Sequence, residues 1–156
     1  MKTLTIETPI KVYAYNELSA EELKLTESAL EATLRSYAPY SNFHVGAAVL
    51  LKNGVIVTGT NQENVAYPSG LCAERTALFY ANSQYPDVPV KALAIVARDA
   101  DGVAKCDIVS PCGACRQVMV ETEKRFGRPM RVLLCGAEEV YVAESASNLL
   151  PLSFDF

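Results

Sequence analysis

The stretch from His44 to Thr60 reads HVGAAVLLKNGVIVTGT, and it indicates the class of fold more clearly than any other segment. Its two β-rich runs, residues 44–51 and 55–60, are separated by Lys52-Asn53-Gly54. An Asn-Gly pair between two such runs is a strong signal for a β-hairpin. The stretch therefore predicts two neighbouring antiparallel strands.

The segments on both sides of this hairpin alternate between helix and strand patterns. Ser19 and Glu22 have the spacing of a capping box, and a helix over residues 20–37 is predicted with an apolar face formed by Leu23, Leu30, Leu34 and Tyr37. Beyond the hairpin, we expect helices over residues 72–82 and 113–126 and strands over residues 92–97, 131–135 and 140–142. Strands that alternate with helices imply a layered α/β domain with some parallel pairing.

The length of 156 residues is typical of one domain, so residues 1–156 are interpreted as a single domain. Residues 3–14 show a loose apolar alternation that Pro9 interrupts, which is typical of an edge strand or an arm.

The charge balance bears on the kind of partner. The net charge is -4, whereas proteins that grip polymeric nucleic acid usually carry a basic patch. The nearest basic cluster, residues 124–131, has the composition of a solvated helix end. No apolar run approaches the roughly 18 residues of a membrane span, and the first residues lack the apolar segment of a signal peptide. We therefore expect a small-molecule substrate, no polymeric nucleic acid, no membrane and a cytoplasmic location.

The cysteines point to a metal site. Their number is five, and without a secretory signal free thiols or metal ligands are favoured over disulfides. Three of them lie in two short segments, Cys72-Ala73-Glu74-Arg75 and Pro111-Cys112-Gly113-Ala114-Cys115. Each segment is expected where a loop enters a helix, and the positive end of a helix favours the thiolate form that binds metal. Two helix starts would thus aim three thiolates at one point.

Three protein ligands leave the fourth tetrahedral position of a zinc ion open, which is the arrangement of catalytic zinc. Glu74, two residues from Cys72, would face that open side and move protons. The alternatives are a redox pair at Cys112 and Cys115, or a structural zinc closed by a fourth cysteine. Cys135 lies in an apolar strand and is expected to be a buried thiol. Cys106 therefore remains the candidate for the fourth ligand of a structural zinc site.

The pattern Cys-x-Glu followed by Pro-Cys-x-x-Cys resembles the signature of zinc-dependent deaminases. Four segments in order resemble the small homotetrameric cytidine deaminases, namely FHVGAA at 43–48, NQENVAY at 61–67, CAERTALF at 72–79 and LLPLSF at 149–154. The resemblance runs from about residue 20 to residue 154. Residues 1–18 lie outside it and are therefore interpreted as a possible N-terminal extension. It implies a three-layer α/β/α domain with a mixed central sheet of about five strands, and a homotetramer.

The resemblance also implies roles for individual residues. Cys72, Cys112 and Cys115 would bind Zn²⁺, and Glu74 would take a proton from the attacking water, deliver it to N3 of the pyrimidine and help protonate the leaving amine. Arg75 would donate hydrogen bonds to the thiolate sulfurs and offset the net charge of -1 that three thiolates leave on Zn²⁺.

For the substrate, the resemblance implies that Asn61 and Glu63 hold the ribose hydroxyls and that Phe43 packs on the nucleoside. Phe154 from a neighbouring subunit would stack on the base, and Ala73 would also contact the substrate. Tyr67 is left open between the pocket and a subunit interface. His44, the only histidine, stands where the family usually has Pro and is interpreted as a surface or packing residue.

The expected reaction is the hydrolytic deamination of cytidine and deoxycytidine to uridine and deoxyuridine with release of ammonia, in pyrimidine salvage. One alternative keeps this chemistry for a blasticidin-type nucleoside antibiotic, and the Asn61-x-Glu63 pair argues against it. Another is a non-catalytic binding module stabilised by zinc, which would need four protein ligands. The region from Arg98 to Asp107 is interpreted as an enlarged loop.

Overall fold

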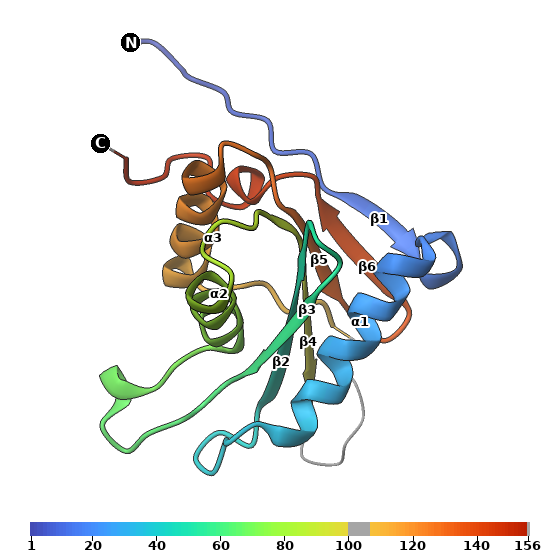
Figure 1. The fold of residues 1–156 in the computed structure, drawn as a ribbon. Coiled ribbons are helices and arrows are strands. Elements are labelled where there is room, and N and C mark those ends of the chain that lie inside the picture. Colours follow the sequence, from blue (N-terminus) through green and yellow to red (C-terminus); the bar gives the residue numbers. More distant parts are fainter. Residues whose placement is uncertain (100–106, 156) are drawn as a thin grey trace.

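The computed structural model describes residues 1–99 and 107–155, and the chain folds around one mixed sheet (Figure 1). Its strand order is β1-β6-β5-β4-β2-β3, with β4 and β5 parallel and all other neighbours antiparallel. The six strands are β1 (Lys11–Ala14), β2 (His44–Leu51), β3 (Ile56–Thr60), β4 (Val90–Arg98), β5 (Arg131–Cys135) and β6 (Glu139–Ala143). The predicted α/β class, the mixed sheet and the hairpin are confirmed.

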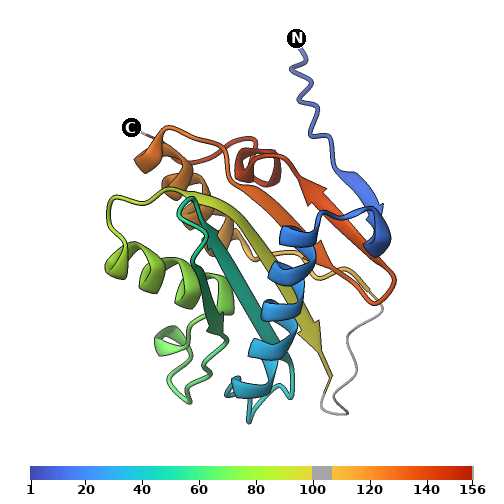
Figure 2. The same ribbon diagram turned by 45° about the vertical axis from the view of Figure 1, so that its right-hand side comes forward.

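The sheet has one strand more than the roughly five that were predicted, namely β1. It lies in the segment that the sequence indicated to be either an edge strand or an arm. Residues 11–14 pair with β6 as an edge strand, whereas residues 1–10 run away from the body as an exposed extended segment (Figures 1 and 2). The pairing therefore begins two residues after Pro9, which lacks the N–H that a ladder requires.

Three α-helices in the described part of the chain complete the layers. α1 (Ala20–Ala32) packs on one face of the sheet, and α2 (Ala73–Gln84) and α3 (Gly113–Phe126) pack on the other (Figures 1 and 2). Alternate residues of β2 divide accordingly, because Ala47 and Val49 join the core under α2 and α3, whereas Ala48 and Leu50 join the core under α1. The three-layer α/β/α prediction is thus confirmed. Short 3₁₀ turns lie at Tyr15–Glu17, Thr33–Arg35, Tyr67–Ser69 and Ala146–Leu149.

The first helix differs from its prediction at its C-terminal end. Its capping box is formed, since Ser19 N donates to the Glu22 carboxylate at 2.9 Å and Glu22 N donates to Ser19 Oγ at 3.3 Å. However, the α-helix ends at Ala32, and Leu30 and Leu34 are exposed. The helix lies so close to β2 that a Cβ on Gly46 would collide with its backbone, and this approach places small residues such as Ala29 against the sheet.

The topology brings two helix N-termini to one edge of the sheet. β3 and β4 both run antiparallel to β2, so they end at the same edge, and α2 and α3 follow them there. Gly59 in β3 lets α2 approach closely, because a Cβ at this position would lie 2.7 Å from the carbonyl oxygen of Ala73. Within the described ranges, none of the helices has the length and apolar character needed to cross a membrane.

Candidate metal and substrate site

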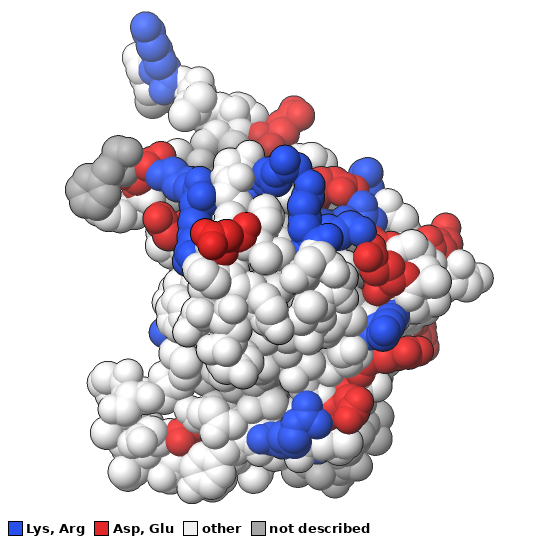
Figure 3. Space-filling model, viewed as in Figure 1, with Lys and Arg blue, Asp and Glu red and all other residues white. Residues whose placement is uncertain are grey.

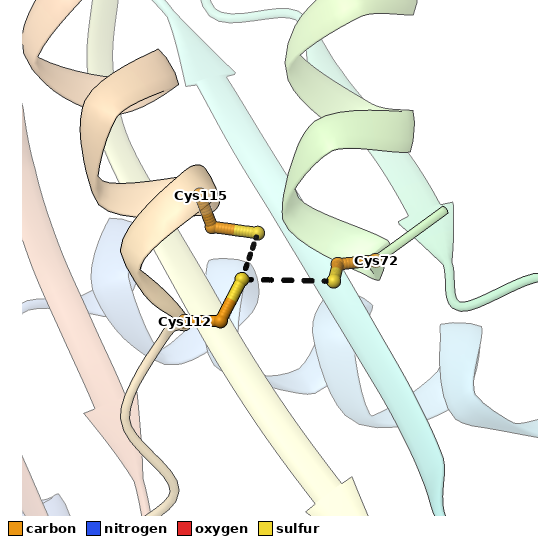
Figure 4. A group of neighbouring side chains, drawn as sticks. All are labelled: Cys72, Cys112 and Cys115. Carbon is orange, nitrogen blue, oxygen red and sulfur yellow. Dashed lines mark hydrogen bonds between the residues drawn. The ribbon is translucent and has the colours of Figure 1, made fainter. Parts of the chain in front are cut away.

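Three thiols meet where α2 and α3 begin. Figure 4 shows Cys72 at the start of α2 and Cys112 and Cys115 at the start of α3 with their sulfur atoms turned toward one another. The Sγ atoms of Cys72 and Cys112 are 3.9 Å apart, those of Cys112 and Cys115 are 3.5 Å apart, and all three lie within 4.8 Å of one another. The two segments are thus brought to one point, as the sequence predicted.

These spacings fit a tetrahedral metal. With Zn–S bonds of about 2.3 Å, two sulfur ligands of a tetrahedral zinc lie about 3.8 Å apart. Cys72 is half-buried, Cys112 is exposed and Cys115 is buried, so the group is open to solvent on the Cys112 side. The donor set and its geometry therefore suit zinc with room for a fourth, non-protein ligand.

The surroundings favour a thiolate at Cys72. Its pKa is lowered to about 5, chiefly by a hydrogen bond from the Cys115 thiol, with Arg75 and Cys112 contributing. Nη2 of Arg75 lies 3.5 Å from the Cys72 sulfur. The buried Nε of Arg75 has no hydrogen-bond partner among the described residues, so this guanidinium retains a donor beside the sulfur atoms. Arg75 is thus placed to offset negative charge on the thiolates.

Glu74 lies beside the thiols on the first turn of α2 and is buried. Burial raises the pKa of its carboxyl group, and the charge of Cys72 adds to this effect, while the backbone, Cys115 and Arg75 oppose it. Because its side chain is buried and does not project into bulk solvent, Glu74 is not an ordinary solvated helix carboxylate.

The other two cysteines have different positions. Cys135 is buried in the core under α1, on the face of the sheet opposite to the three thiols, and burial raises its pKa to about 12. This confirms that it is a buried thiol and removes it as a fourth ligand. Cys106 and most of the predicted 98–107 loop lie outside the described residues.

A pocket of about 500 Å³ adjoins the thiols. Its walls come from the loop after α1, the loop after β3 and the start of α2, and they comprise Tyr40, Ser41, Asn61, Gln62, Glu63, Asn64, Tyr67, Gly70, Leu71, Cys72 and Arg75. Tyr67, which the sequence left open, lies in this pocket, 77 % exposed, with its ring edge-to-face against Tyr40 at 6.4 Å. A hollow of about 650 Å³ on the outer faces of α2 and α3 contains none of the thiols.

Asn61 and Glu63 lie in the pocket wall but already have protein partners. The Asn61 amide accepts a hydrogen bond from Val45 N at 2.9 Å and donates one to the carbonyl of Phe43 at 2.8 Å. The Glu63 carboxylate accepts from Tyr40 N at 2.9 Å and from the Ser41 hydroxyl, and these bonds lower its pKa, with that of Ser41 the largest cause.

The remaining predicted residues are placed as follows. Phe43 is half-buried against the core, and Ala73 is completely buried at the start of α2. Phe154 is 68 % exposed, and its backbone is bonded at both N and O to Gln117 on α3. It is not among the described residues that line the pocket of its own chain. His44 Nδ1 lies 2.6 Å from Ser36 Oγ, and this contact agrees with a packing role.

Ser41 also belongs to this site, although it was not predicted from the sequence. Its hydroxyl donates to Glu63 and accepts a hydrogen bond from Phe43 N at 3.0 Å, so it links two predicted substrate residues. The available signal was its place two residues before Phe43 in a Ser-Asn pair, which is typical of a turn whose side chains bond to nearby backbone.

Comparison with known proteins agrees with this geometry. A family model of the cytidine and deoxycytidylate deaminase zinc-binding region matches residues 19–126. A cytidine deaminase of Halalkalibacterium halodurans is 47% identical over 97 residues, which are 62% of this chain and 68% of that protein. One of Mycobacterium tuberculosis is 40% identical over 110 residues, 69% of this chain and 77% of that protein.

Solved structures agree as well. The crystal structure of cytidine deaminase from Burkholderia pseudomallei superposes with a TM-score of 0.69 at 40% identity, covering 84% of this chain and 97% of that chain. The family model covers more than half of the chain and includes all three thiols and Glu74. The chain therefore belongs to the cytidine and deoxycytidylate deaminase family.

Proposed function

We propose that this protein is a zinc-dependent hydrolase that deaminates cytidine and deoxycytidine, giving uridine and deoxyuridine with release of ammonia. The observation that carries the proposal is the meeting of three thiols, within 4.8 Å of one another, with buried Glu74 beside them and with Cys72 in the wall of a pocket. The names of the relatives, which are cytidine deaminases at 40% to 50% identity, support the choice of substrate.

In this proposal Cys72, Cys112 and Cys115 hold the zinc ion. Zinc bound there would supply a Lewis acid that lowers the pKa of water to about 7 and so makes hydroxide available at neutral pH. Glu74 takes the proton of the attacking water and delivers it to N3 of the pyrimidine, then helps protonate the amine that leaves from C4. Water is consumed and ammonia released, so no oxidant or reductant takes part.

The chain's other residues bind and orient the nucleoside. Asn61 and Glu63 receive the ribose, and their position in the pocket wall supports this. Phe43 packs on the nucleoside, and Ala73, at the start of α2, also contacts the substrate. Arg75 balances the charge of the thiolates, in line with its 3.5 Å distance from the Cys72 sulfur.

A homotetramer completes the proposal, with Phe154 of one subunit stacking on the base held by its neighbour. Phe154 and Leu152 are exposed in the single chain, and so are Phe79 and Tyr80 on the outer face of α2. Exposed aromatic and aliphatic residues of this kind are typical of surfaces that another chain covers. We place residues 1–156 in one domain with residues 1–18 as an extension, and the reaction in the cytoplasm, in pyrimidine salvage.

The test of the function is turnover. Zinc-loaded protein is incubated with cytidine, deoxycytidine, free cytosine and blasticidin S, while the loss of substrate absorbance and the release of ammonia are followed. The proposal expects turnover of both nucleosides and a much lower rate with the antibiotic. Absence of turnover with both nucleosides would contradict it, and faster turnover of the antibiotic would favour the blasticidin-type alternative.

A further inference from the structure

Glu63 is held by one short loop. Its Oε2 accepts hydrogen bonds from Tyr40 N at 2.9 Å and from Ser41 N at 3.3 Å, and its Oε1 accepts one from the Ser41 hydroxyl. Both carboxylate oxygens are thus bound from the same side, and the side chain of Ser41 provides the only contact to Oε1 among the hydrogen bonds of the described residues.

The hydroxyl of Ser41 has a defined direction. An ionised carboxylate only accepts hydrogen bonds, so the Ser41 proton must lie toward Glu63. On its other side, Ser41 Oγ accepts from Phe43 N at 3.0 Å. Ser41 therefore connects the backbone of Phe43 to the carboxylate of Glu63 through a chain of two hydrogen bonds.

The remaining capacity of Glu63 is small. A carboxylate offers about four lone-pair positions for hydrogen bonds, and three of those on Glu63 are filled by the loop at residues 40–41. What remains is an acceptor position on Oε1, in the pocket that also contains Cys72. Such a site receives a donor such as a ribose hydroxyl, and the direction of the free lone pair depends on the Ser41 bond.

The loop itself does not depend on the Ser41 hydroxyl. Tyr37 N donates to Asn61 O at 3.0 Å, and Glu63 N donates to Tyr37 O at 2.8 Å, so the backbones on both sides of the contact are joined. Asn42 has a φ of 52°, which Asn tolerates better than most residues. The conformation of the turn is therefore also favoured by Asn42, independently of the Ser41 hydroxyl. Removing one hydroxyl at position 41 should leave this framework in place.

We propose that Ser41 is a positioning residue for the ribose, which fixes the Glu63 carboxylate so that its free lone pair meets a sugar hydroxyl. This inference rests on the proposed function. It predicts that Ser41 contributes to binding only when the ligand has a 2′- or 3′-hydroxyl on the sugar, and only when Glu63 is present.

The experiment measures equilibrium binding of uridine and of 2′,3′-dideoxyuridine to zinc-loaded wild type, Ser41→Ala and Ser41→Thr by calorimetry. Ser41→Ala should bind uridine about 10-fold more weakly than the wild type, because it loses one hydrogen bond to a charged group. Dideoxyuridine binding should not change, and Ser41→Thr, which keeps a hydroxyl, should restore uridine binding. The value of KM for cytidine should rise by a similar factor in Ser41→Ala with little change in kcat.

A double-mutant cycle tests whether the effect passes through Glu63. In a Glu63→Ala background, Ser41→Ala should have no further effect on uridine binding. Equal weakening for both ligands, no weakening at all, or an undiminished effect without Glu63 would each overturn the inference. A protein that shows the expected binding pattern but does not deaminate cytidine would contradict the proposed function while leaving the role of Ser41 in place.

Discussion

Cys72 and Cys135 carry the same side chain, and their surroundings shift their pKa values in opposite directions. Cys72 lies beside two other thiols and Arg75, and its pKa is lowered to about 5, mainly by the hydrogen bond from Cys115. Cys135 lies among apolar side chains, where burial raises its pKa to about 12. The same hydrogen bond raises the pKa of Cys115. The feature that directs a zinc ion to the first environment is therefore the meeting of three thiols, whereas Cys135 is buried on the other face of the sheet.

We expect Cys112→Ala to lose most of the bound zinc, because two thiolates no longer form a three-ligand site. Cys135→Ala is the matched control, since it removes a thiol from the opposite face of the sheet. Metal analysis of the two purified variants measures the difference. Equal zinc content in both variants would contradict the assigned ligand set.

Arg75→Gln should lower the turnover of cytidine by about 10-fold or more while zinc stays bound, because groups that contact metal ligands typically have effects of this size. Arg75→Lys retains the charge and should retain more of the activity. Steady-state kinetics together with zinc analysis measures both effects. If turnover in Arg75→Gln equals that of the wild type, Arg75 does not act by offsetting charge.

At this scale the sequence predicts the thiols and Glu74 because their relations are local. Cys72 and Glu74 are two residues apart, and Cys112 and Cys115 are three apart, so each segment needs only a helix start to aim its side chains. The contacts of Glu63 could not be predicted in this way. They depend on the pairing of the chain around Tyr37 with the chain around Gln62, which is a tertiary feature.

At the scale of elements, buried Glu123 joins α3 to the segment that leads to the C-terminus. Its carboxylate accepts from Met130 N at 2.6 Å, from Ala146 N at 2.8 Å and from the hydroxyls of Ser145 and Ser147 at 2.9 to 3.0 Å. These bonds fix the end of α3 to the start of β5 and to the turn after β6. The same region carries the chain toward Phe154.

Glu123→Gln should destabilise the fold by about 1–3 kcal/mol, because an amide presents N–H groups to donors and leaves them unsatisfied. Glu138→Gln changes an exposed carboxylate in the β5–β6 turn and should have little effect. Urea unfolding at one fixed protein concentration compares them. Similar midpoints for the two variants would show that the Glu123 contacts contribute little.

For the first helix, the apolar pattern of the sequence was not sufficient to predict its C-terminal end or its buried face. The sequence predicted most strands and the last two helices closely, because their apolar runs and bounding Gly and Pro residues are local signals. It extended the first helix to residue 37 and chose Leu30 and Leu34 as its buried face, both of which are exposed. The buried face was decided by the close approach of α1 to Gly46, which no property of the helix itself reveals.

At the scale of the whole molecule, positive and negative side chains are interspersed on the face shown in Figure 3, with a broad uncharged area between them. This distribution agrees with a small neutral substrate rather than a polyanion. The oligomeric state is the feature that is hardest to predict from a single chain. Residues such as Phe79 and Leu152 are exposed in the single chain both if they face solvent and if another subunit covers them.

A shared pocket can be tested by mixing two impaired chains. Glu74→Ala supplies Phe154 but no proton carrier, and Phe154→Ala supplies Glu74 but no stacking ring. Co-purified mixed tetramers should contain some pockets with both residues and recover part of the cytidine turnover, while sedimentation should give the mass of four chains. A fully active wild-type monomer would exclude the shared pocket.

The function proposed for this protein depends on three cysteines that hold a zinc ion beside a glutamate that moves protons. Zinc content and cytidine turnover, measured together on wild type and Glu74→Ala, separate the two roles. We predict equal zinc in both proteins and turnover in the wild type alone. Turnover that survives in Glu74→Ala would show that Glu74 is not the proton carrier, and loss of zinc from that variant would show that Glu74 takes part in holding the metal.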